Sequence, residues 1–467
     1  MKTRILFLLL LTLVINLDAA PGWKAAAAKA IITPKENLWM AGYSSRKTGA
    51  KGKLQDLFAK ALVVEDEKGA RLAIITLDLI GVPKLLRVAV AGEAQAKFKL
   101  PPSHLLINAS HTHCGPMIRT VRPIGKNGRE QGAYAAIPTE QAAHRVTETR
   151  EYNAKLHLTF IRLIGECMKN LQPVKLAYNH ARCGFAMNRR LPTEKGFRNS
   201  PYPDGPVDHE VPVLQVRGAK DNLLAVLFGY ACHNTTTGVM EFNGDYAGWA
   251  QEYLEAEHPG TVALFVQGCG GDQNPYPRGT IDLAKKHGRT LATAVEAGLI
   301  ANPKLIDGRL RAALDYVSVD YAAPPTRAAL EEKAKSKNRY DRRHAETLLE
   351  ILDVEGALPK NYPVPVQVIH FGDHLTMVTM GGEVVVDYSL RLKRELGKNR
   401  AVWVAGYSND VMGYIPSLRV LREGGYEGGE AMRYIRSTPH PGPWAETIEG
   451  RLIDRIYFLD RQLNTGP

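Results

Sequence analysis

Six short apolar segments along the chain each end abruptly at residues that can do chemistry. They are rich in Val, Ile, Leu and Phe, and several are bounded by glycine. The segments and the residues that follow them are 72–77 before Asp78, 105–110 before His111, 223–232 before His233, 262–267 before Gly268–Asp272, 375–382 before Glu383 and 401–405 before Gly406–Asp410. Runs of this length and composition are typical of strands covered on both faces. The pattern predicts an α/β fold with its site at the carboxyl ends of the strands.

Helical segments follow several of these strands, as crossover connections require. Asp245 can cap a helix over 246–257, and Gly397 can end a helix that begins near residue 384. A further helix over roughly 326–352 is dense in Lys, Arg and Glu. We interpret this charged helix as a solvated excursion that lies outside the site.

The chain of 467 residues would allow three domains at about 150 residues each. However, no long Pro/Gly/Ser linker divides it, and site-forming strands are predicted on both sides of the charged helix. We therefore predict one large domain over residues 21–467, with mixed central sheet or sheets flanked by helices and a charged helical insertion at about 326–356.

The N-terminus has the pattern of a secretory signal peptide. Lys2 and Arg4 precede an apolar run over 5–17 that ends in small residues before Pro21. The run is shorter than the roughly 20 apolar residues of a transmembrane helix, and no later segment is long and apolar enough to span a bilayer. We expect residues 1–20 to be a signal peptide and the protein to be secreted or periplasmic, or membrane-anchored if the signal stays uncleaved.

The chain has five cysteines, an odd number that is far too small for a disulfide scaffold. They are Cys114, Cys167, Cys183, Cys232 and Cys269. No CxxC spacing occurs among them, which argues against a zinc site built from cysteine. The hydrophobic core has to carry the fold.

Two histidines and a glutamate follow separate predicted strands and form a candidate metal site. His111 and His113 would share a face if their strand continued, because side chains at i and i+2 point the same way. With His233 and Glu383, His111 supplies the three-ligand set of a zinc site that keeps a position open for water. Such a metal lowers the pKa of its water to about 7 and allows hydrolysis without a protein nucleophile. A purely structural role for these residues is the alternative.

Several separate motifs, in order, resemble the neutral (alkaline, non-lysosomal) ceramidase family, and more closely its shorter bacterial relatives that keep only the N-terminal catalytic domain. The resemblance covers most of the mature chain. The motifs are His111-Thr-His113-Cys-Gly-Pro, Asn188-Arg189, Cys232-His233, Gly244-Asp245-Tyr246, Gly271-Asp272, Gly382-Glu383, Asn409-Asp-Val-Met-Gly-Tyr414-Ile and Gly425-Tyr426-Glu427-Gly428.

This resemblance implies a zinc ion and assigns roles to particular residues. The implied ligands are His111, His233, Glu383 and Tyr414. His113 would sit beside the metal for proton transfer, and Arg189 and Tyr426 would hydrogen-bond substrate or the developing oxyanion. Arg189 as a salt-bridge partner and Tyr426 as a core aromatic are the alternatives.

Two departures from the family limit what can be carried over. The ceramidases have a catalytic Ser in a Gly-Asp-Val-Ser-Pro-Asn stretch, whereas Gly271–Pro275 here places Asn274 at that position. An Asn amide can orient substrate but cannot supply the hydroxyl. The chain also ends at Pro467 without the immunoglobulin-like domain of the long ceramidases. Both changes are compatible with amide hydrolysis by a zinc-bound water. However, the resemblance does not imply that ceramide is the substrate.

The formal net charge of +12 lies partly in loops beside the candidate site. The basic residues concerned are Arg119, Arg122, Lys126, Arg129, Arg182, Arg190, Lys195, Arg198 and Arg278. We hypothesise an anionic substrate or docking on an anionic surface. A generally basic exported protein is the alternative. Nucleic acid is a poor candidate, because there is no binding motif and no basic stripe interleaved with aromatics.

The sequence thus predicts an exported zinc-dependent hydrolase that cleaves a linear N-acyl amide in a small-molecule or lipid-like substrate. His113 would assist proton transfer, while Arg189, Tyr426 and Asn274 would position the substrate. One alternative is a cysteine hydrolase in which Cys114 is the nucleophile and His113 the base. Another is a secreted, non-catalytic binding protein that retains the zinc-site fold.

Overall fold

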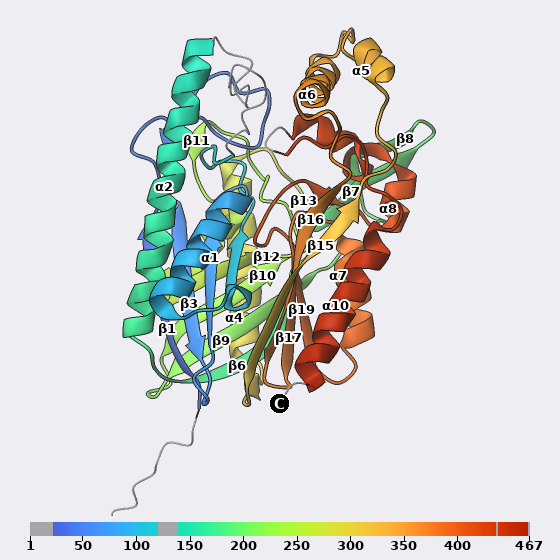
Figure 1. Cartoon of the computed structure of the whole chain (residues 1–467). Coiled ribbons are helices and arrows are strands. Elements are labelled where there is room, and N and C mark those ends of the chain that lie inside the picture. The colour runs from blue at the N-terminus through green and yellow to red at the C-terminus, as the bar shows by residue number, and fades with distance from the viewer. Residues whose placement is uncertain (1–21, 120–138, 436–437, 466–467) are drawn as a thin grey trace, which may run out of the picture.

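The computed structural model describes residues 22–119, 139–435 and 438–465, with the side chains of 139–143 excepted. Two β-sheets pack face to face between helices, so the described chain forms four layers in the order helix, sheet, sheet, helix (Figure 1). The mixed α/β fold with helices flanking the sheets confirms the predicted fold class. The predicted signal peptide over 1–20 lies outside the described residues. Among the described helices, none is long and apolar enough to cross a membrane.

The larger sheet is mixed and has strand order β12-β10-β9-β6-β1-β3-β4-β5, with β14 beside β6. Its strands are β1 (Lys24–Ile31), β3 (Phe58–Glu65), β4 (Arg71–Leu77), β5 (Leu105–Ala109), β6 (Gln172–Arg182), β9 (Glu210–Gly218), β10 (Leu223–Tyr230), β12 (Val262–Gln267) and β14 (Lys304–Ile306). The smaller sheet has order β15-β16-β17-β19. Its strands are β15 (Leu310–Asp320), β16 (Asn361–Phe371), β17 (Leu375–Met380) and β19 (Ala401–Ala405).

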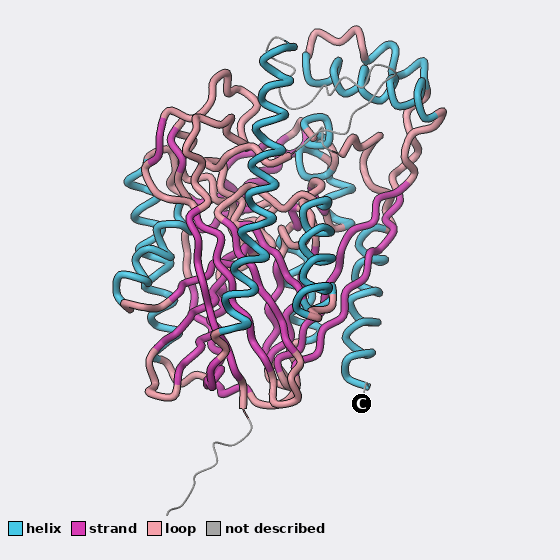
Figure 2. The backbone as a smooth tube through the Cα atoms, turned by 60° about the vertical axis from the view of Figure 1, so that its left-hand side comes forward, coloured by secondary structure: helices cyan, strands magenta, loops and turns pink. Residues whose placement is uncertain are grey.

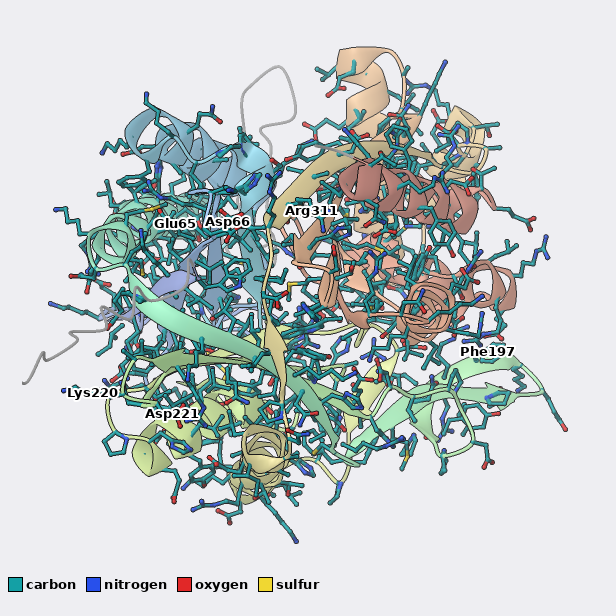
Figure 3. All side chains as sticks on the ribbon, turned by 90° about the horizontal axis from the view of Figure 1, so that it is seen from below. Glu65, Asp66, Phe197, Lys220, Asp221 and Arg311 are labelled. Atoms are coloured by element: carbon teal, nitrogen blue, oxygen red, sulfur yellow. The ribbon has the colours of Figure 1, made fainter. Side chains whose placement is uncertain are left out.

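Short strand pairs complete the upper part of the molecule. They are β2 (Gly52–Lys53) with β11 (Glu241–Phe242), β7 (Ala186–Thr193) with β8 (Gly196–Tyr202) and β13 (Gln273–Pro275), and β18 (Glu383–Val384) with β20 (Tyr414–Ile415). The β7–β8 hairpin, which carries Phe197, projects from the body of the protein (Figure 3).

The helices divide between the two outer faces. Over the larger sheet lie α1 (Lys84–Phe98), α2 (Thr139–Lys169), α3 (Asp245–Glu257) and α4 (Ile281–Ile300). Over the smaller sheet lie α7 (Val386–Leu396) and α10 (Ile448–Thr465). In Figure 2, α10 is the helix that ends at the marked C-terminus. The remaining helical segments are α5 (Arg327–Lys333), α6 (Arg339–Glu355), α8 (Leu418–Glu423), α9 (Gly425–Gly428), and the short 3-10 turns η1 (Pro102–His104) and η2 (Glu430–Tyr434).

The core between the two sheets explains why their strands are apolar on both faces. Ile74 and Leu227 from the larger sheet meet Ile369, Met377 and Trp403 from the smaller one, and all are almost fully buried. Burial of one such side chain contributes about 1.5–3 kcal/mol. At the lower end, Asp66 accepts a hydrogen bond from the backbone N–H of Leu310 at 2.8 Å and ties the sheets together. Figure 3 shows Asp66 from below, with Arg311 nearby.

All six predicted strands exist, as β4, β5, β10, β12, β17 and β19. Three neighbouring pairs are parallel, namely β4 with β5, β10 with β12, and β17 with β19, so their carboxyl ends lie together. The helix predicted to end at Gly397 is α7, and Gly397 is its C-cap. The charged segment is two helices rather than one, because Thr326 caps α5 and Asn338 caps α6.

Asp245 behaves differently from the predicted N-cap. It is the first residue of α3, with a left-handed φ of 53°, and its carboxylate accepts the backbone N–H groups of Thr237 and Tyr246 at 3.0 and 2.7 Å. The carboxylate therefore ties the 233–238 loop to the start of the helix. All five cysteines are buried and free of disulfides, which leaves the fold to its hydrophobic core as predicted.

Candidate metal centre

A cavity of about 200 Å³ opens above the carboxyl ends of the parallel strands. His111, His113, Glu383 and Tyr414 line its inner end. The rest of the lining is mainly aromatic and arginine side chains: Trp39, Tyr43, Tyr340, Tyr426, Tyr434, Arg46, Arg119, Arg343 and Arg433. The fold thus gathers residues from distant parts of the chain in one pocket.

His111 lies in a turn rather than on a strand. Strand β5 ends at Ala109, and His111 adopts a left-handed φ of 66°. Expecting His111 and His113 to share a face through strand alternation was therefore wrong, although their rings do meet, with centroids 4.9 Å apart. A left-handed conformation costs a non-glycine residue about 1–2 kcal/mol. Such strain is common where a side chain is held for function.

The two histidines that were predicted to bind metal are oriented by backbone carbonyls. The Nδ1 atoms of His111 and His233 lie 2.6 Å from the carbonyl oxygens of Ile80 and Gly270. Because a carbonyl only accepts, each Nδ1 carries the proton and each Nε2 presents a lone pair. Such a second interaction is how metal-binding histidines are usually fixed.

Three lone-pair atoms therefore converge with no proton between them. Glu383 Oε2 lies 3.2 Å from His111 Nε2 and 3.3 Å from His233 Nε2. This oxygen is buried and has no hydrogen-bond partner. Burial of such an atom is costly unless something compensates it. A cation held by the three atoms would do so, and the donor set of two imidazoles and one carboxylate suits zinc.

The protonation states favour the same interpretation. Burial, and then the charge of Arg189, lower the pKa of His233 to about 4. Burial, and then the neighbouring His111, lower the pKa of His113 well below its usual value. Neutral imidazoles and an ionised carboxylate are the forms that bind a metal.

His113 forms the third corner of a histidine cluster that can hold a metal. Ligand atoms of His111, His113 and His233 all lie within 4.8 Å of one another. The Nε2 atom of His113 is 3.2 Å from that of His111, which can only accept, so His113 Nε2 carries a proton. Its Nδ1 is buried without a partner. His113 can therefore serve as a ligand or as a proton carrier, and it lines the cavity.

Arg189 lies behind the metal centre and connects three side chains. Its guanidinium donates to Tyr414 Oη at 2.9 Å, to Asn274 Oδ1 at 3.1 Å and to Glu427 Oε1 at 2.8 Å. Tyr414 Oη in turn lies 3.4 Å from His233 Nε2. Arg189 and Asn274 are buried and do not line the cavity, whereas Tyr426 does, with its ring centroid 5.4 Å from that of Tyr414.

Glu427 was not singled out by sequence reasoning, yet it neutralises two buried arginines. It accepts from Arg189 and, at 2.8 Å, from Arg190. Burial alone would raise the pKa of Glu427, but the guanidinium of Arg189 holds it below the usual value. Its position in the Gly425–Gly428 motif was the only signal in the sequence.

The charged insertion is part of the site, which corrects its interpretation as a solvated excursion. Tyr340 and Arg343 of α6 line the cavity together with Glu383. Tyr340 Oη lies 2.8 Å from Ser44 Oγ, so the insertion is tied to the loop that follows β1. The density of Lys, Arg and Glu predicted a charged helix, but it did not show which neighbours the polar side chains would contact.

The basic loops only partly surround the cavity. Of the nine basic residues predicted beside the site, Arg119 lines the cavity, and Arg190 is instead buried between Glu423 and Glu427. Arg122, Lys126 and Arg129 lie outside the described residues. Arg46, Arg343 and Arg433 supply the other positive charges of the lining.

The cysteine-hydrolase alternative finds no support in the geometry. Cys114 is fully buried, and its Sγ faces the carbonyl oxygens of Thr237 and Val239 at 3.8 Å rather than His113. Burial, and then the nearby charge of Asp245, raise the pKa of its thiol to about 12. A thiol in this environment is inert.

Comparisons with known proteins agree with this architecture. The model of the family "Neutral/alkaline non-lysosomal ceramidase, N-terminal" matches residues 26–293. The crystal structure of neutral ceramidase from Pseudomonas aeruginosa is similar to this chain at 18% identity and a TM-score of 0.70, covering 95% of this chain and 74% of that one. A structure described as a ceramidase complexed with C2 matches at 18% identity and a TM-score of 0.69, covering 95% and 75%. The chain belongs to the neutral/alkaline non-lysosomal ceramidase family.

Proposed function

We propose that this protein is an exported zinc-dependent amidohydrolase that cleaves a linear N-acyl amide bond. Family membership and fold support a ceramidase-like hydrolase. The single observation that carries the zinc assignment is that His111 Nε2 and His233 Nε2 both lie within 3.3 Å of Glu383 Oε2, which has no hydrogen-bond partner. Tyr414 would complete the ligand set, because its oxygen lies beside His233 and accepts from Arg189.

The protein side chains around this centre have distinct tasks. When bound, zinc would polarise the scissile carbonyl and lower the pKa of a water to about 7. His113 lines the cavity as a neutral imidazole, which can take up a proton from water and then deliver that proton to the leaving amine. Burial raises the pKa of Tyr414 well above its usual value, and the charge of Arg189 opposes that rise. Arg189 also fixes the position of Asn274. Tyr426 presents its ring, and the hydroxyl it carries can donate to the substrate.

A lipid-like substrate is supported by a second cavity beside the first. It has a volume of about 870 Å³ and shares Arg119 with the smaller cavity. Apolar residues dominate its lining, among them Val82, Leu85, Leu86 and Ile118. Together the two spaces can take an amide at the metal centre and an apolar chain beside it. The predicted signal peptide supports export.

Metal analysis paired with hydrolysis assays tests this proposal. We expect wild type to contain about one zinc per chain and His233→Ala to lose the metal and the activity together. The matched control is His144→Ala, because His144 is on the surface with its side chain 70% exposed. N-acyl sphingoid and N-acyl amino compounds serve as substrates. Full zinc occupancy in His233→Ala would refute the ligand assignment.

The same experiment separates the enzyme from a binding protein. Asn274 stands where the family's serine is expected, and its amide oxygen is already engaged by Arg189. Zinc at full occupancy without turnover of any amide in the panel would favour the non-catalytic alternative. Turnover that a chelator abolishes and zinc restores would support the hydrolase.

A further inference from the structure

A row of tyrosine rings connects the metal centre to the charged insertion. Tyr414 contacts Tyr426 with ring centroids 5.4 Å apart, Tyr426 contacts Tyr434 at 6.0 Å, and Tyr434 contacts Tyr340 at 4.8 Å. All four rings line the same cavity. The cavity therefore has an inner end at the candidate metal ligands and an outer end at α6, joined by one aromatic wall.

Arg343 stands at the outer end of that wall. It follows Tyr340 by three residues on α6, so the two side chains lie on the same side of the helix. Both line the cavity. The Nη2 atom of Arg343 is buried and has no hydrogen-bond partner. An arginine usually places its five donors on carboxylates, phosphates or carbonyls, so a buried unused donor on a residue that lines a cavity indicates a missing acceptor.

The charges around Arg343 do not neutralise it. Burial lowers its pKa, and so do the neighbouring charges of Arg339 and Arg342, while Glu346 is the one carboxylate whose charge opposes them. Among the described lining residues, the sole carboxylate is Glu383, which faces His111 and His233 at the inner end. Positive charge therefore predominates around Arg343 at the outer end.

The other arginines of the cavity are already used. Arg46 donates to the carbonyls of Ala41, His113 and Val239. Arg433 pairs with Asp341 at 3.1 Å and with Glu430 at 3.3 Å. Arg119 donates to the carbonyl of Val411 at 3.4 Å. Arg46 and Arg433 each keep one buried Nε without a partner, but their terminal nitrogens are engaged. Arg343 is the arginine of the described lining whose guanidinium makes no hydrogen bond or ion pair, and its buried Nη2 is left without an acceptor.

We propose that Arg343 determines specificity by binding an anionic group of the substrate, a carboxylate, sulfonate or phosphate, at a position remote from the scissile amide. This inference rests on the proposed amide hydrolase function, because it places the scissile bond at the inner end of the cavity. The proposed substrates carry a negative charge. A neutral N-acyl sphingoid base does not, and so it offers Arg343 no charged partner. The insertion that carries Arg343 thereby becomes the specificity element of the site.

Binding to metal-free protein tests the proposal without depending on turnover. Two pairs of probes are titrated calorimetrically after metal is removed with a chelator. The first pair is N-dodecanoyl-aminohexanoate and its methyl ester, which place the charge on the amine side. The second is the N-butyl monoamide of dodecanedioic acid and its methyl ester, which place the charge on the acyl side. We expect wild type to bind the acid of one pair at least about tenfold more tightly than the ester, as a charge-assisted hydrogen bond to arginine implies.

Variants assign that preference to Arg343. Arg343→Gln should reduce the ratio of acid to ester affinity to about one, and Arg343→Lys should retain part of it, because the charge stays but the planar fork is lost. Lys337→Gln removes a charge from an exposed position on the same insertion and should leave the ratio unchanged. Equal thermal melting of the four proteins shows that all are folded.

The outcomes distinguish this inference from the proposed function. Equal affinity of wild type for acid and ester in both pairs, or an equal loss in Lys337→Gln, would overturn the anion site. If zinc-loaded protein nevertheless cleaves the neutral esters at their amide, the hydrolase remains. If the acid preference depends on Arg343 but no amide is cleaved, the anion site remains and the hydrolase fails.

Discussion

The two ends of the cavity are built in different ways. At the inner end, His111, His233 and Glu383 are almost fully buried, and the two rings are held by backbone carbonyls of other segments. At the outer end, Tyr340 and Arg343 are half-buried on an inserted helix that meets the body through side chains such as Ser44. The inner end has its geometry imposed by the sheets. Side chains at the outer end can be replaced without disturbing the sheets. This end is therefore suited to determine substrate specificity.

The contrast extends to electrostatics. Behind the inner end, Glu427 forms ion pairs with both Arg189 and Arg190. At the outer end, the guanidinium of Arg343 has no such partner, and its Nη2 is buried without a hydrogen bond. Fully paired buried networks hold side chains in one arrangement, whereas an unpaired donor stays available to a ligand. Chemistry and recognition are thus assigned to separate walls of one cavity.

The largest effect that separates the two ends is expected for metal binding. Glu383→Gln should lower zinc affinity at least about 100-fold and remove activity, because an amide is a far poorer ligand than a carboxylate. Arg343→Gln should keep full zinc occupancy. Zinc titration monitored by a competing chromophoric chelator measures both. If Glu383→Gln bound zinc as tightly as wild type does, the proposed difference between the inner and the outer end of the cavity would be wrong.

Stability provides the second comparison, between a buried and an exposed ion pair. Glu427→Gln should lower the free energy of unfolding by about 3 kcal/mol, because it leaves Arg189 without an opposing charge in the interior. The control is Glu446→Gln, which removes the partner of Arg422 from a pair whose side chains are 61% and 62% exposed. That change should cost less than about 1 kcal/mol. Urea unfolding of the three proteins gives the values, and similar losses in both variants would contradict the prediction.

The smallest effect concerns Asp410, which lines the larger cavity next to Arg119. Burial raises the pKa of Asp410 to about 6, although Tyr362 donates to its carboxylate at 2.6 Å. An unfolded Asp has a pKa of about 3.9, so between these values the folded state binds more protons. This contribution to stability is therefore present at low pH and is lost as the pH rises through about 6.

The variant Asp410→Asn removes this titration and keeps an acceptor for Tyr362. Between about pH 4 and 6.5, wild type should lose about 2 kcal/mol relative to the variant. Asp373→Asn, at an 89% exposed side chain, should run parallel to wild type. The measurement is urea unfolding across this pH range. If Asp410→Asn and wild type change in parallel, the carboxylate has no raised pKa.

Much of the fold and part of the site could be predicted from local pattern. The six apolar runs are strands because a sequence that is apolar on both faces can only be buried between layers. His233 and Glu383 were found because they directly follow such runs, and parallel strands bring their carboxyl ends together. Tyr414 was identified as a candidate ligand only through the family resemblance, because no local sequence pattern marks it.

Other features depend on contacts between segments far apart in the chain. The meeting of His111 and His113 results from a turn with a left-handed residue, not from the alternation that their spacing suggested. The entry of Tyr340 and Arg343 into the cavity depends on how the insertion packs against the loop after β1, which no pattern within the insertion encodes.

The amino-acid pattern therefore specified the layers, the strand ends and the kinds of ligand, because burial and periodicity are local properties that each segment carries with it. The tertiary structure decided which side chains share one cavity, which nitrogen of each histidine faces Glu383, and which arginine is left unpaired. Those outcomes depend on angles and distances between segments up to several hundred residues apart, and these arise only when the two sheets and the insertion are packed together.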